Sequence, residues 1–217
     1  MIHREGIQII LINTAVWVVL AALVLLFGES PVWKVIVSLL SLFMIAIVLL
    51  FFRVPTRQTT VNPEMIVSPA DGHVVEVKRE YVKEYFDCEC NVISVFLSLF
   101  DVHITWLPTG GEVVYSKYYP GAHTFAFLPK SSEKNEHTSV VVRDGQGREV
   151  MFRQIAGIVA RRVVCYANEG ETFEQASEAG FIKFGSRLTI IVPADVEPLV
   201  EGGDKVLGSV TPLARFK

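Results

Sequence analysis

The sequence IQIILINTAVWVVLAALVLLF occupies residues 7–27, and VWKVIVSLLSLFMIAIVLLFF occupies residues 32–52. Each of these segments has 21 residues, of which 18 are apolar. A helix of that length rises about 30 Å, which is enough to cross the hydrocarbon core of a bilayer. Only Gly-Glu-Ser-Pro separates the segments, and glycine and proline favour a tight turn. The pattern therefore predicts a transmembrane helical hairpin within residues 1–57.

Charged residues around the hairpin indicate its orientation. Arg4, Arg53 and Arg57 flank the open ends, whereas Glu29 and Lys34 near the turn offset each other. Because basic residues prefer the cytoplasmic side, we expect the chain after residue 57 to face the cytoplasm, at the inner (cytoplasmic) membrane. A cleavable signal peptide would have a shorter apolar core and a cleavage site, and a soluble hairpin would have a polar face. Neither feature is seen, but the length also permits a hairpin that lies in one leaflet.

The rest of the chain, residues 58–217, differs in charge and pattern. Residues 1–57 carry a net charge of +2 and residues 58–217 carry −5, so no basic excess is available to bind nucleic acid. Short β-branched and aromatic runs recur between turn residues, as in residues 138–143 and 148–152 around Asp-Gly-Gln-Gly. This pattern predicts an all-β sandwich or barrel. Only residues 171–179 have a helical pattern.

The three cysteines indicate neither a metal site nor a disulfide framework. Cys88 and Cys90 form a C-x-C pair, but no second cluster of cysteine or histidine follows at ligand spacing, and Cys165 is alone. We therefore expect no bound metal. A small, odd number of cysteines also suits a reducing compartment.

Three positions could carry chemistry when judged from the residues alone. His103 follows an apolar strand candidate, where a histidine can be both fixed and accessible enough to move protons. Asp71 belongs to a Pro-Ala-Asp-Gly sequence that also forms an ordinary turn. Gly185 and Ser186 interrupt a β pattern, which is also typical of a bulge. Each signal is weak by itself, because an ordinary structural feature also accounts for it.

The order of the motifs resembles one known family. The apolar hairpin is followed by FFRVPTR at 51–57, SPADG at 68–72, DVH at 101–103, PKSSEKNE at 129–136 and FGSR at 184–187. Over nearly the whole chain, this set is similar to the short, membrane-bound form of the phosphatidylserine decarboxylase family. The Phe-Gly-Ser-Arg motif is its most specific part. The sequence VEGGDKVLGS near the C-terminus also resembles a turn of biotinyl and lipoyl domains, which implies a barrel-sandwich-hybrid-like β domain.

The resemblance implies a proenzyme that cuts itself between Gly185 and Ser186. The products would be a β chain of residues 1–185 and an α chain of residues 186–217. Ser186 Oγ would attack the carbonyl carbon of Gly185, and residue 186 would end as a covalent pyruvoyl group, the cofactor of the family. Glycine offers no side chain that could block this attack.

The resemblance also implies roles for the other two positions. His103 would be the base that activates the hydroxyl of Ser186, and Asp71 would orient His103. His103 would later protonate the substrate carbanion. Longer family members have a second histidine three residues after the first, and this chain has Trp106 there.

The implied activity is that of a carboxy-lyase, which converts phosphatidylserine to phosphatidylethanolamine and CO₂ with the pyruvoyl ketone as electron sink. Arg53 and Arg57 leave little slack between bilayer and domain and can attract anionic lipids. The partners would be the phospholipid, the membrane and the two chains of one precursor, and a homo-oligomer is compatible with the sequence. Two other functions are also compatible: decarboxylation of an archaeal-type serine ether lipid (archaetidylserine), and a non-enzymatic, membrane-tethered barrel-sandwich adaptor.

Overall fold

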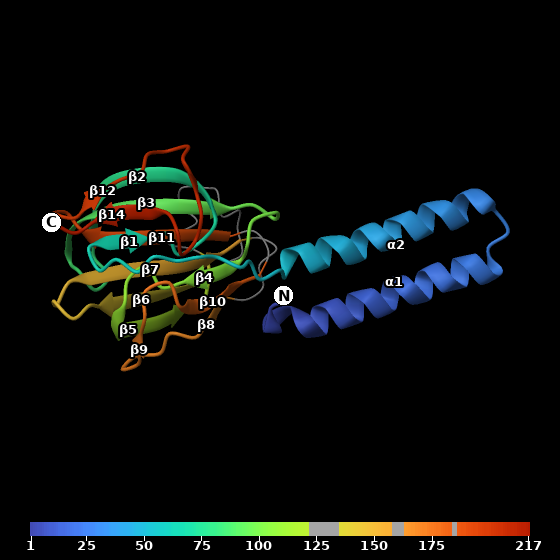
Figure 1. The fold of residues 1–217 in the computed structure, drawn as a ribbon, viewed down its shortest axis with the longest axis horizontal. Coiled ribbons are helices and arrows are strands. Elements are labelled where there is room, and N and C mark those ends of the chain that lie inside the picture. The colour runs from blue at the N-terminus through green and yellow to red at the C-terminus, as the bar shows by residue number, and fades with distance from the viewer. Residues whose placement is uncertain (122–134, 158–162, 184–185) are drawn as a thin grey trace. The chain divides into compact units, whose positions relative to one another are not determined.

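The computed structural model describes residues 1–121, 135–157, 163–183 and 186–217 (Figure 1). The chain divides into two compact units, Met1–Pro55 and Thr56–Lys217. The first unit is helical, and the second consists mainly of β-strands and their connections. The predicted combination of two apolar N-terminal helices with a mostly β domain is thereby confirmed.

Two long helices, α1 (Ile7–Phe27) and α2 (Pro31–Phe51), form the first unit. α1 ends where the N–H of Gly28 donates to the carbonyl of Val24 at 3.0 Å. α2 begins one residue before the expected segment, because Pro31 occupies the first helical turn, where its missing N–H costs no hydrogen bond. The Gly-Glu-Ser-Pro sequence therefore both ends the first helix and starts the second.

Backbone hydrogen bonds close the open end of the hairpin. The N–H of Val54 donates to the carbonyl of Met1, and the N–H of His3 donates to the carbonyl of Phe52, both at 2.8 Å. A short 3-10 turn, η1 (Arg4–Gly6), leads from this contact into α1. The two ends of the hairpin are thus tied to each other by the main chain itself.

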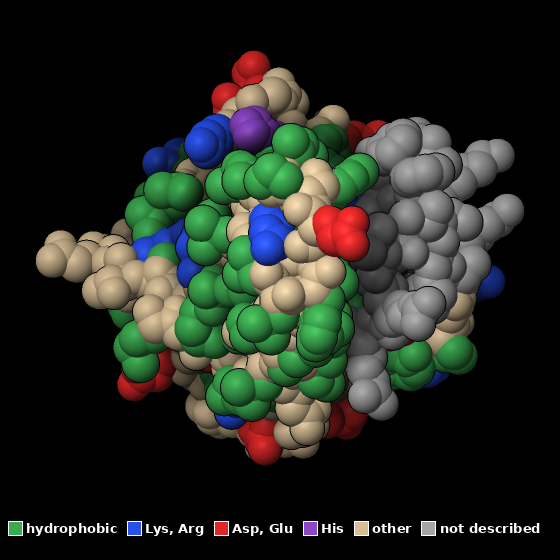
Figure 2. Space-filling view, turned by 90° about the vertical axis from the view of Figure 1, so that its right-hand side faces the viewer, with side chains coloured by type: hydrophobic (Ala, Val, Ile, Leu, Met, Phe, Trp, Pro, Cys, Tyr) green, Lys and Arg blue, Asp and Glu red, His purple; other side chains and the backbone are tan. Residues whose placement is uncertain are grey.

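The surface of the hairpin is apolar. α1 has no buried residue, and α2 has only Ser41 and Phe51 buried. Large apolar side chains are exposed along both helices, with Phe27 77% exposed. Figure 2 faces the turn end of the hairpin and shows hydrophobic side chains with few charged ones among them. Both helices are long and apolar enough to cross a membrane, and such a surface has no side that suits water.

The second unit contains three antiparallel sheets within the described residues. The large sheet has eight strands in the order β13-β2-β3-β11-β7-β6-β5-β9, and the two small sheets have the orders β1-β14-β12 and β4-β10-β8. The bounds are β1 (Met65–Val67), β2 (Gly72–Val82), β3 (Cys88–Leu97), β4 (Ile104–Trp106), β5 (Gly111–Tyr119), β6 (His137–Arg143), β7 (Glu149–Ala156), β8 (Val163–Cys165), β9 (Thr172–Phe173), β10 (Glu178–Ile182), β11 (Ser186–Pro193), β12 (Glu197–Pro198), β13 (Lys205–Val206) and β14 (Pro212–Arg215).

The core lies on one face of the large sheet. Strand residues alternate between two faces, and most of the central-strand residues that face the larger cluster are apolar and buried, while a smaller cluster around Met151 and Ile191 lies on the other face. Leu188 and Ile190 of β11 pack there with Phe152 of β7 and Val95 of β3. The two small sheets add Leu213 and other side chains to the same cluster. The core therefore fixes which side of each central strand faces inward.

Residues 171–179 are not helical, contrary to the sequence pattern. They form β9, a turn and the start of β10. Ala176 has a φ of +66°, which a right-handed helix cannot contain. The buried side-chain amide of Gln175 donates to the carbonyls of Met65 and Pro108, at 2.6 and 3.1 Å. Tertiary hydrogen bonds therefore override the local helical propensity.

The substitution Phe152→Ala tests the assignment of the core. Phe152 is fully buried, so we expect the free energy of unfolding of the β unit to fall by about 3–5 kcal/mol. Urea-dependent pulse proteolysis of the detergent-solubilised chain measures this. Val75→Ala is the control, because Val75 is 46% exposed on β2 and its loss should change stability by only about 0.5 kcal/mol. Equal effects of the two variants would contradict the placement of the core.

Candidate active site

Ser186 is the first residue of β11. It pairs with Leu97 of β3 on one side and with Ala156 of β7 on the other. Its side chain is fully buried, and its Oγ has no hydrogen-bond partner among the described residues. Such a group is rare in folded proteins, and a catalytic role can account for it. Gly185, the other residue of the predicted cleavage site, lies outside the described residues.

The side chain of Ser186 lies on the core face of the large sheet. Leu188 and Ile190 follow it at every second position and belong to the core. Arg187 and Thr189 therefore lie on the opposite face. The start of β11 thus presents a hydroxyl on one face and a guanidinium on the other.

His103 lies between β3 and β4 and is fully buried. Its Nδ1 is 3.0 Å from the backbone carbonyl oxygen of Asp101. Because a carbonyl oxygen can only accept, Nδ1 carries the proton in this contact, and a neutral ring then has its lone pair on Nε2. Nε2 can accept a proton from a neighbouring hydroxyl, which is what a general base must do.

Asp101 organises the turn that precedes His103. Its carboxylate accepts hydrogen bonds from the N–H and the Oγ of Ser98, at 2.8 and 2.7 Å. The closed turn fixes the carbonyl of Asp101 against the ring of His103. Sequence reasoning noted Asp101 only as part of a motif; the Ser-x-x-Asp spacing was the signal for its structural role.

The structure brings His103 and Ser186 to the same end of β11. Leu97, the last residue of β3, pairs with Ser186, and His103 follows six residues later. The N–H of Ile182, four residues before Ser186, donates to the carbonyl of His103 at 3.1 Å. Both residues therefore lie near the start of β11.

Asp71 is held by other groups. The Nη1 and Nη2 atoms of Arg57 donate to its two carboxylate oxygens at 2.7 and 2.6 Å. The N–H of Gly208 adds a third bond at 2.8 Å. The side chains of Arg57 and Asp71 are only 14% and 8% exposed. Both oxygens of Asp71 are thus engaged, while Nδ1 of His103 has the carbonyl of Asp101, so orientation of His103 by Asp71 stays a prediction.

The ion pair also reaches Trp106. The guanidinium carbon of Arg57 lies 4.9 Å from the centre of the Trp106 ring. The backbone N–H of Trp106 donates to the carbonyl of Pro69 at 2.9 Å, which brings β4 beside the turn that holds Asp71. Sequence reasoning missed the partner of Asp71, because Arg57 is 14 residues away and belongs to no shared motif. Arg57 is a partly buried ion-pair partner here, whereas the sequence suggested a flanking charge that orients the hairpin and attracts anionic lipids.

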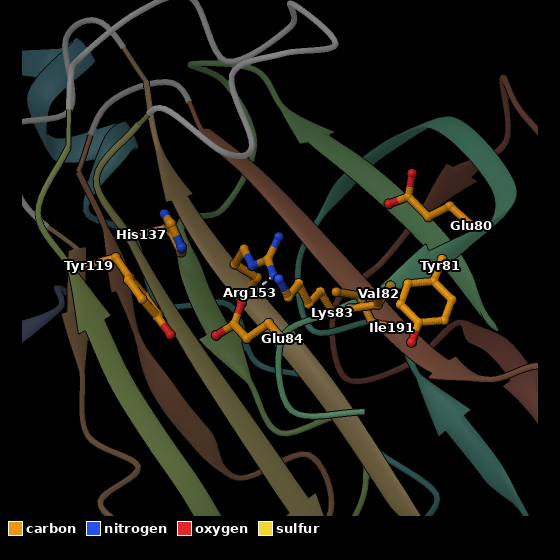
Figure 3. Close-up of a pocket in the computed structure, with 9 residues that line it drawn as sticks. All are labelled: Glu80, Tyr81, Val82, Lys83, Glu84, Tyr119, His137, Arg153 and Ile191. Carbon is orange, nitrogen blue, oxygen red and sulfur yellow. Dashed lines mark hydrogen bonds and ion pairs between the residues drawn. The ribbon is translucent and has the colours of Figure 1, made fainter. Parts of the chain in front are cut away.

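A polar cavity of about 400 Å³ lies on the face of the large sheet that is opposite to the core (Figure 3). Arg153 forms an ion pair with Glu84, and its Nε donates to Ser139 Oγ at 3.1 Å. Burial alone would raise the pKa of Glu84, but the charge of Arg153 and several hydrogen bonds outweigh burial and lower it. Burial lowers the pKa of His137 below its ordinary value, which favours the neutral ring. The cavity is lined by Glu80, Tyr81, Val82, Lys83, Glu84, Tyr119, His137, Arg153 and Ile191.

Several known proteins are similar in sequence to this chain over nearly its whole length. Residues 44–214 match the profile of the family described as phosphatidylserine decarboxylase. A protein of Amoebophilus asiaticus, named phosphatidylserine decarboxylase proenzyme, is 43% identical over 217 residues, which are 99% of this chain and 96% of that protein. Proteins of the same name from Parabacteroides distasonis and Cytophaga hutchinsonii are each 38% identical, over 99% of this chain and 98% of their own lengths. The chain therefore belongs to the phosphatidylserine decarboxylase family.

Proposed function

We propose that this chain is a membrane-bound proenzyme that cuts itself once and then converts phosphatidylserine to phosphatidylethanolamine and CO₂. One observation carries the proposal. The hydroxyl of Ser186 is buried and without a partner among the described residues, at the first residue of a central strand. Relatives that match nearly the whole chain carry the name proenzyme, which supports a maturation step by cleavage.

The proposed cleavage begins when Ser186 Oγ attacks the carbonyl carbon of Gly185. The hydroxyl proton passes to a base, the C–N bond breaks, and the freed nitrogen takes up a proton, so that the peptide becomes an ester. Loss of the Ser186 α-proton then expels the Gly185 carboxylate and leaves a carbon–carbon double bond beside the nitrogen. Water replaces the nitrogen, which leaves as ammonia. Residue 186 ends as a pyruvoyl group, and the sequence of steps needs no oxidant.

We assign the role of base to His103. Its Nδ1–H is engaged by the carbonyl of Asp101, so Nε2 is the atom of the neutral ring that accepts a proton. Its burial excludes water that would compete for that proton. In the later reaction the same Nε2 would return a proton to the substrate carbon, a transfer that contributes about 10²–10⁴-fold to rate.

The proposed cofactor is residue 186 itself after cleavage. The unpartnered Oγ of Ser186 fits this role, because no hydrogen bond within the described residues must be broken when the hydroxyl is consumed. When it has formed, the ketone and its amide withdraw the electron pair that the departing CO₂ leaves on the substrate carbon. The surrounding strands hold this position buried, where electrostatic interactions are strong.

The two proposed chains stay together after the cut. The α chain, residues 186–217, would contribute β11, β12, β13 and β14, and the β chain would contribute the remaining strands. β11 pairs with β3 from Ser186 to Pro193 and with β7 from Ser186 to Ile191. Separation of the chains would break both ladders and open the core. We also infer a barrel-sandwich-hybrid arrangement, which the return of β13 to pair with β2 supports.

We propose that the hairpin anchors the enzyme in the inner membrane, with the β unit on the cytoplasmic side. The exposed apolar surfaces of α1 and α2 support insertion, and Arg4 and Arg53 at the open end support this orientation. A membrane anchor gives the site a high local concentration of its lipid substrate. The phospholipid and the membrane are therefore the partners that we propose.

Ser186→Ala should abolish both cleavage and decarboxylation, because no hydroxyl remains to attack Gly185. Intact mass spectrometry should find the 32-residue segment 186–217 with a blocked N-terminus in the wild type, and only the full chain in the variant. Ser94→Ala is the control, because Ser94 is also buried in the large sheet but is distant in sequence from the cleavage site. An active Ser186→Ala chain would exclude the proposal.

His103→Ala should slow cleavage by about 100-fold or more, because the hydroxyl of Ser186 loses its base. A time course of intact mass after synthesis measures the rate. His73→Ala is the matched control, because His73 is an exposed histidine of β2 and the variant should mature normally. Normal maturation of His103→Ala would assign the base to another residue.

Asp71→Asn and Arg57→Gln separate two roles for Asp71. Each variant leaves one buried charge unpaired, so each should lower the free energy of unfolding by about 3–5 kcal/mol. In the double variant the two losses should be less than additive. If Asp71 acts only through its ion pair, the double variant should also mature faster than Asp71→Asn. If Asp71 acts on His103, maturation should stay slow in the double variant.

A further inference from the structure

Three side chains that can carry positive charge surround Ile155, on the face of the large sheet opposite to the side chain of Ser186. Ile155 of β7 pairs with His137 of β6 on one side and with Arg187 of β11 on the other. Arg153 is two residues from Ile155 and therefore shares its face.

Arg187 is buried but incompletely paired. It is 3% exposed, and its Nε has no hydrogen-bond partner among the described residues. Its Nη2 lies 3.2 Å from Oε2 of Glu76, a long contact with a side chain that is 36% exposed. Burial lowers the pKa of Arg187, against the attraction of Glu76 and Glu80. A buried guanidinium N–H without an acceptor is costly, so a ligand that supplies the acceptor would account for its position.

Arg153 lines the cavity on this face, and Arg187 lies on the same face but is not among the residues that line the cavity. Figure 3 shows Arg153 in the middle of the lining, near Glu84 and between His137 and Lys83. The volume of about 400 Å³ suits a small organic group. The lining carries both signs of charge, with Arg153 and Lys83 opposed by Glu80 and Glu84. The headgroup of a serine phospholipid also carries both signs, as phosphate, carboxylate and ammonium.

We propose that Arg187 and Arg153 form a subsite for an organophosphate anion, and that this subsite holds the phosphate of the serine phospholipid substrate. The inference rests on the proposed function and adds to it the recognition of the headgroup. Guanidinium groups bind phosphate through paired, charge-assisted hydrogen bonds. His137 is not assigned to the anion, because its Nδ1 is 2.8 Å from the carbonyl of Asn135 and its neutral Nε2 is an acceptor.

The position of Arg187 relative to the reacting residue favours this assignment. Arg187 is bonded directly to residue 186. In the proposed decarboxylation the ketone at residue 186 would react with the amine of the substrate, which would hold the headgroup next to Arg187. Only four covalent bonds separate that amine from the phosphorus atom of a serine phospholipid. The ketone carbon of the proposed pyruvoyl group would be the α-carbon of residue 186, which belongs to the backbone of β11 directly beside Arg187.

Steady-state kinetics of Arg187→Gln and Arg153→Gln test the subsite with dihexanoyl phosphatidylserine as substrate. We expect KM to rise about 10-fold or more in each variant, while kcat of the matured enzyme stays within about 3-fold. Arg143→Gln is the control, because Arg143 lies on β6 in an exposed ion pair with Glu149 and should leave both constants unchanged. A structural role alone would not separate KM from kcat.

Competition distinguishes the sources of the anion. Glycerophosphoserine should inhibit the wild type competitively and should inhibit both variants at least about 10-fold more weakly. Inorganic phosphate as the stronger inhibitor would assign the subsite to free phosphate and overturn the lipid assignment. KM and inhibition within about 2-fold of the wild type in both matured variants would overturn the subsite itself.

Arg187 is next to the proposed cleavage site, so Arg187→Gln could also slow maturation. A second experiment therefore measures binding in a chain that is not cleaved. The uncut Ser186→Ala chain should bind glycerophosphoserine in calorimetry, and adding Arg153→Gln or Arg187→Gln should weaken that binding about 10-fold. Equal binding by all three chains, or no binding by any, would overturn the subsite. Because this arm needs no activity, it is independent of the proposed decarboxylation, which fails only if the wild type releases no CO₂.

Discussion

Backbone pairing on both sides of Ser186 is the constraint on which the rest of the structure depends. The residue pairs with Leu97 of β3 and with Ala156 of β7 at the point where β11 begins. The ladders fix the direction of the side chain, since alternation along a strand leaves only two choices. The same pairing brings the end of β3, and with it the turn before His103, to the start of β11. The geometry of the candidate site is therefore a consequence of strand register.

The register also gives the two faces of the large sheet different chemistry. The core face carries the Ser186 hydroxyl, which has no hydrogen-bond partner within the described part of the chain, and nearby dipoles strongly influence charge that develops at such a buried group. The other face carries Arg153 and Arg187, each with an acidic partner, and Arg153 lines a polar cavity there. Residues 186 and 187 are adjacent, so a single peptide bond separates the serine on the core face from the arginine on the other face.

Sequence patterns predicted the features that depend on local composition. They did not predict features that depend on contacts between residues distant in sequence. The hairpin was predictable because two long apolar runs leave little choice to a helix in or near a bilayer, and Ser186 and His103 came from a motif order that covers most of the chain. Gln175 defeated the helical pattern of residues 171–179 through bonds to Met65 and Pro108. Asp71 has a buried partner, Arg57, that no local spacing reveals. Both the contacts of Gln175 and the Arg57–Asp71 ion pair are tertiary contacts, which form only when the chain has folded.

The distribution of strands between the two proposed chains has a consequence for assembly. The segment after residue 185 supplies β11 to the middle of the large sheet, β13 to its edge and β14 to a small sheet. In the precursor these strands are delivered by a covalent connection, so their docking is intramolecular. After the cut the same contacts belong to two molecules, and unfolded halves would have to find each other by diffusion. The proposed cleavage would therefore convert a single chain into a heterodimer, whose renaturation would depend on protein concentration.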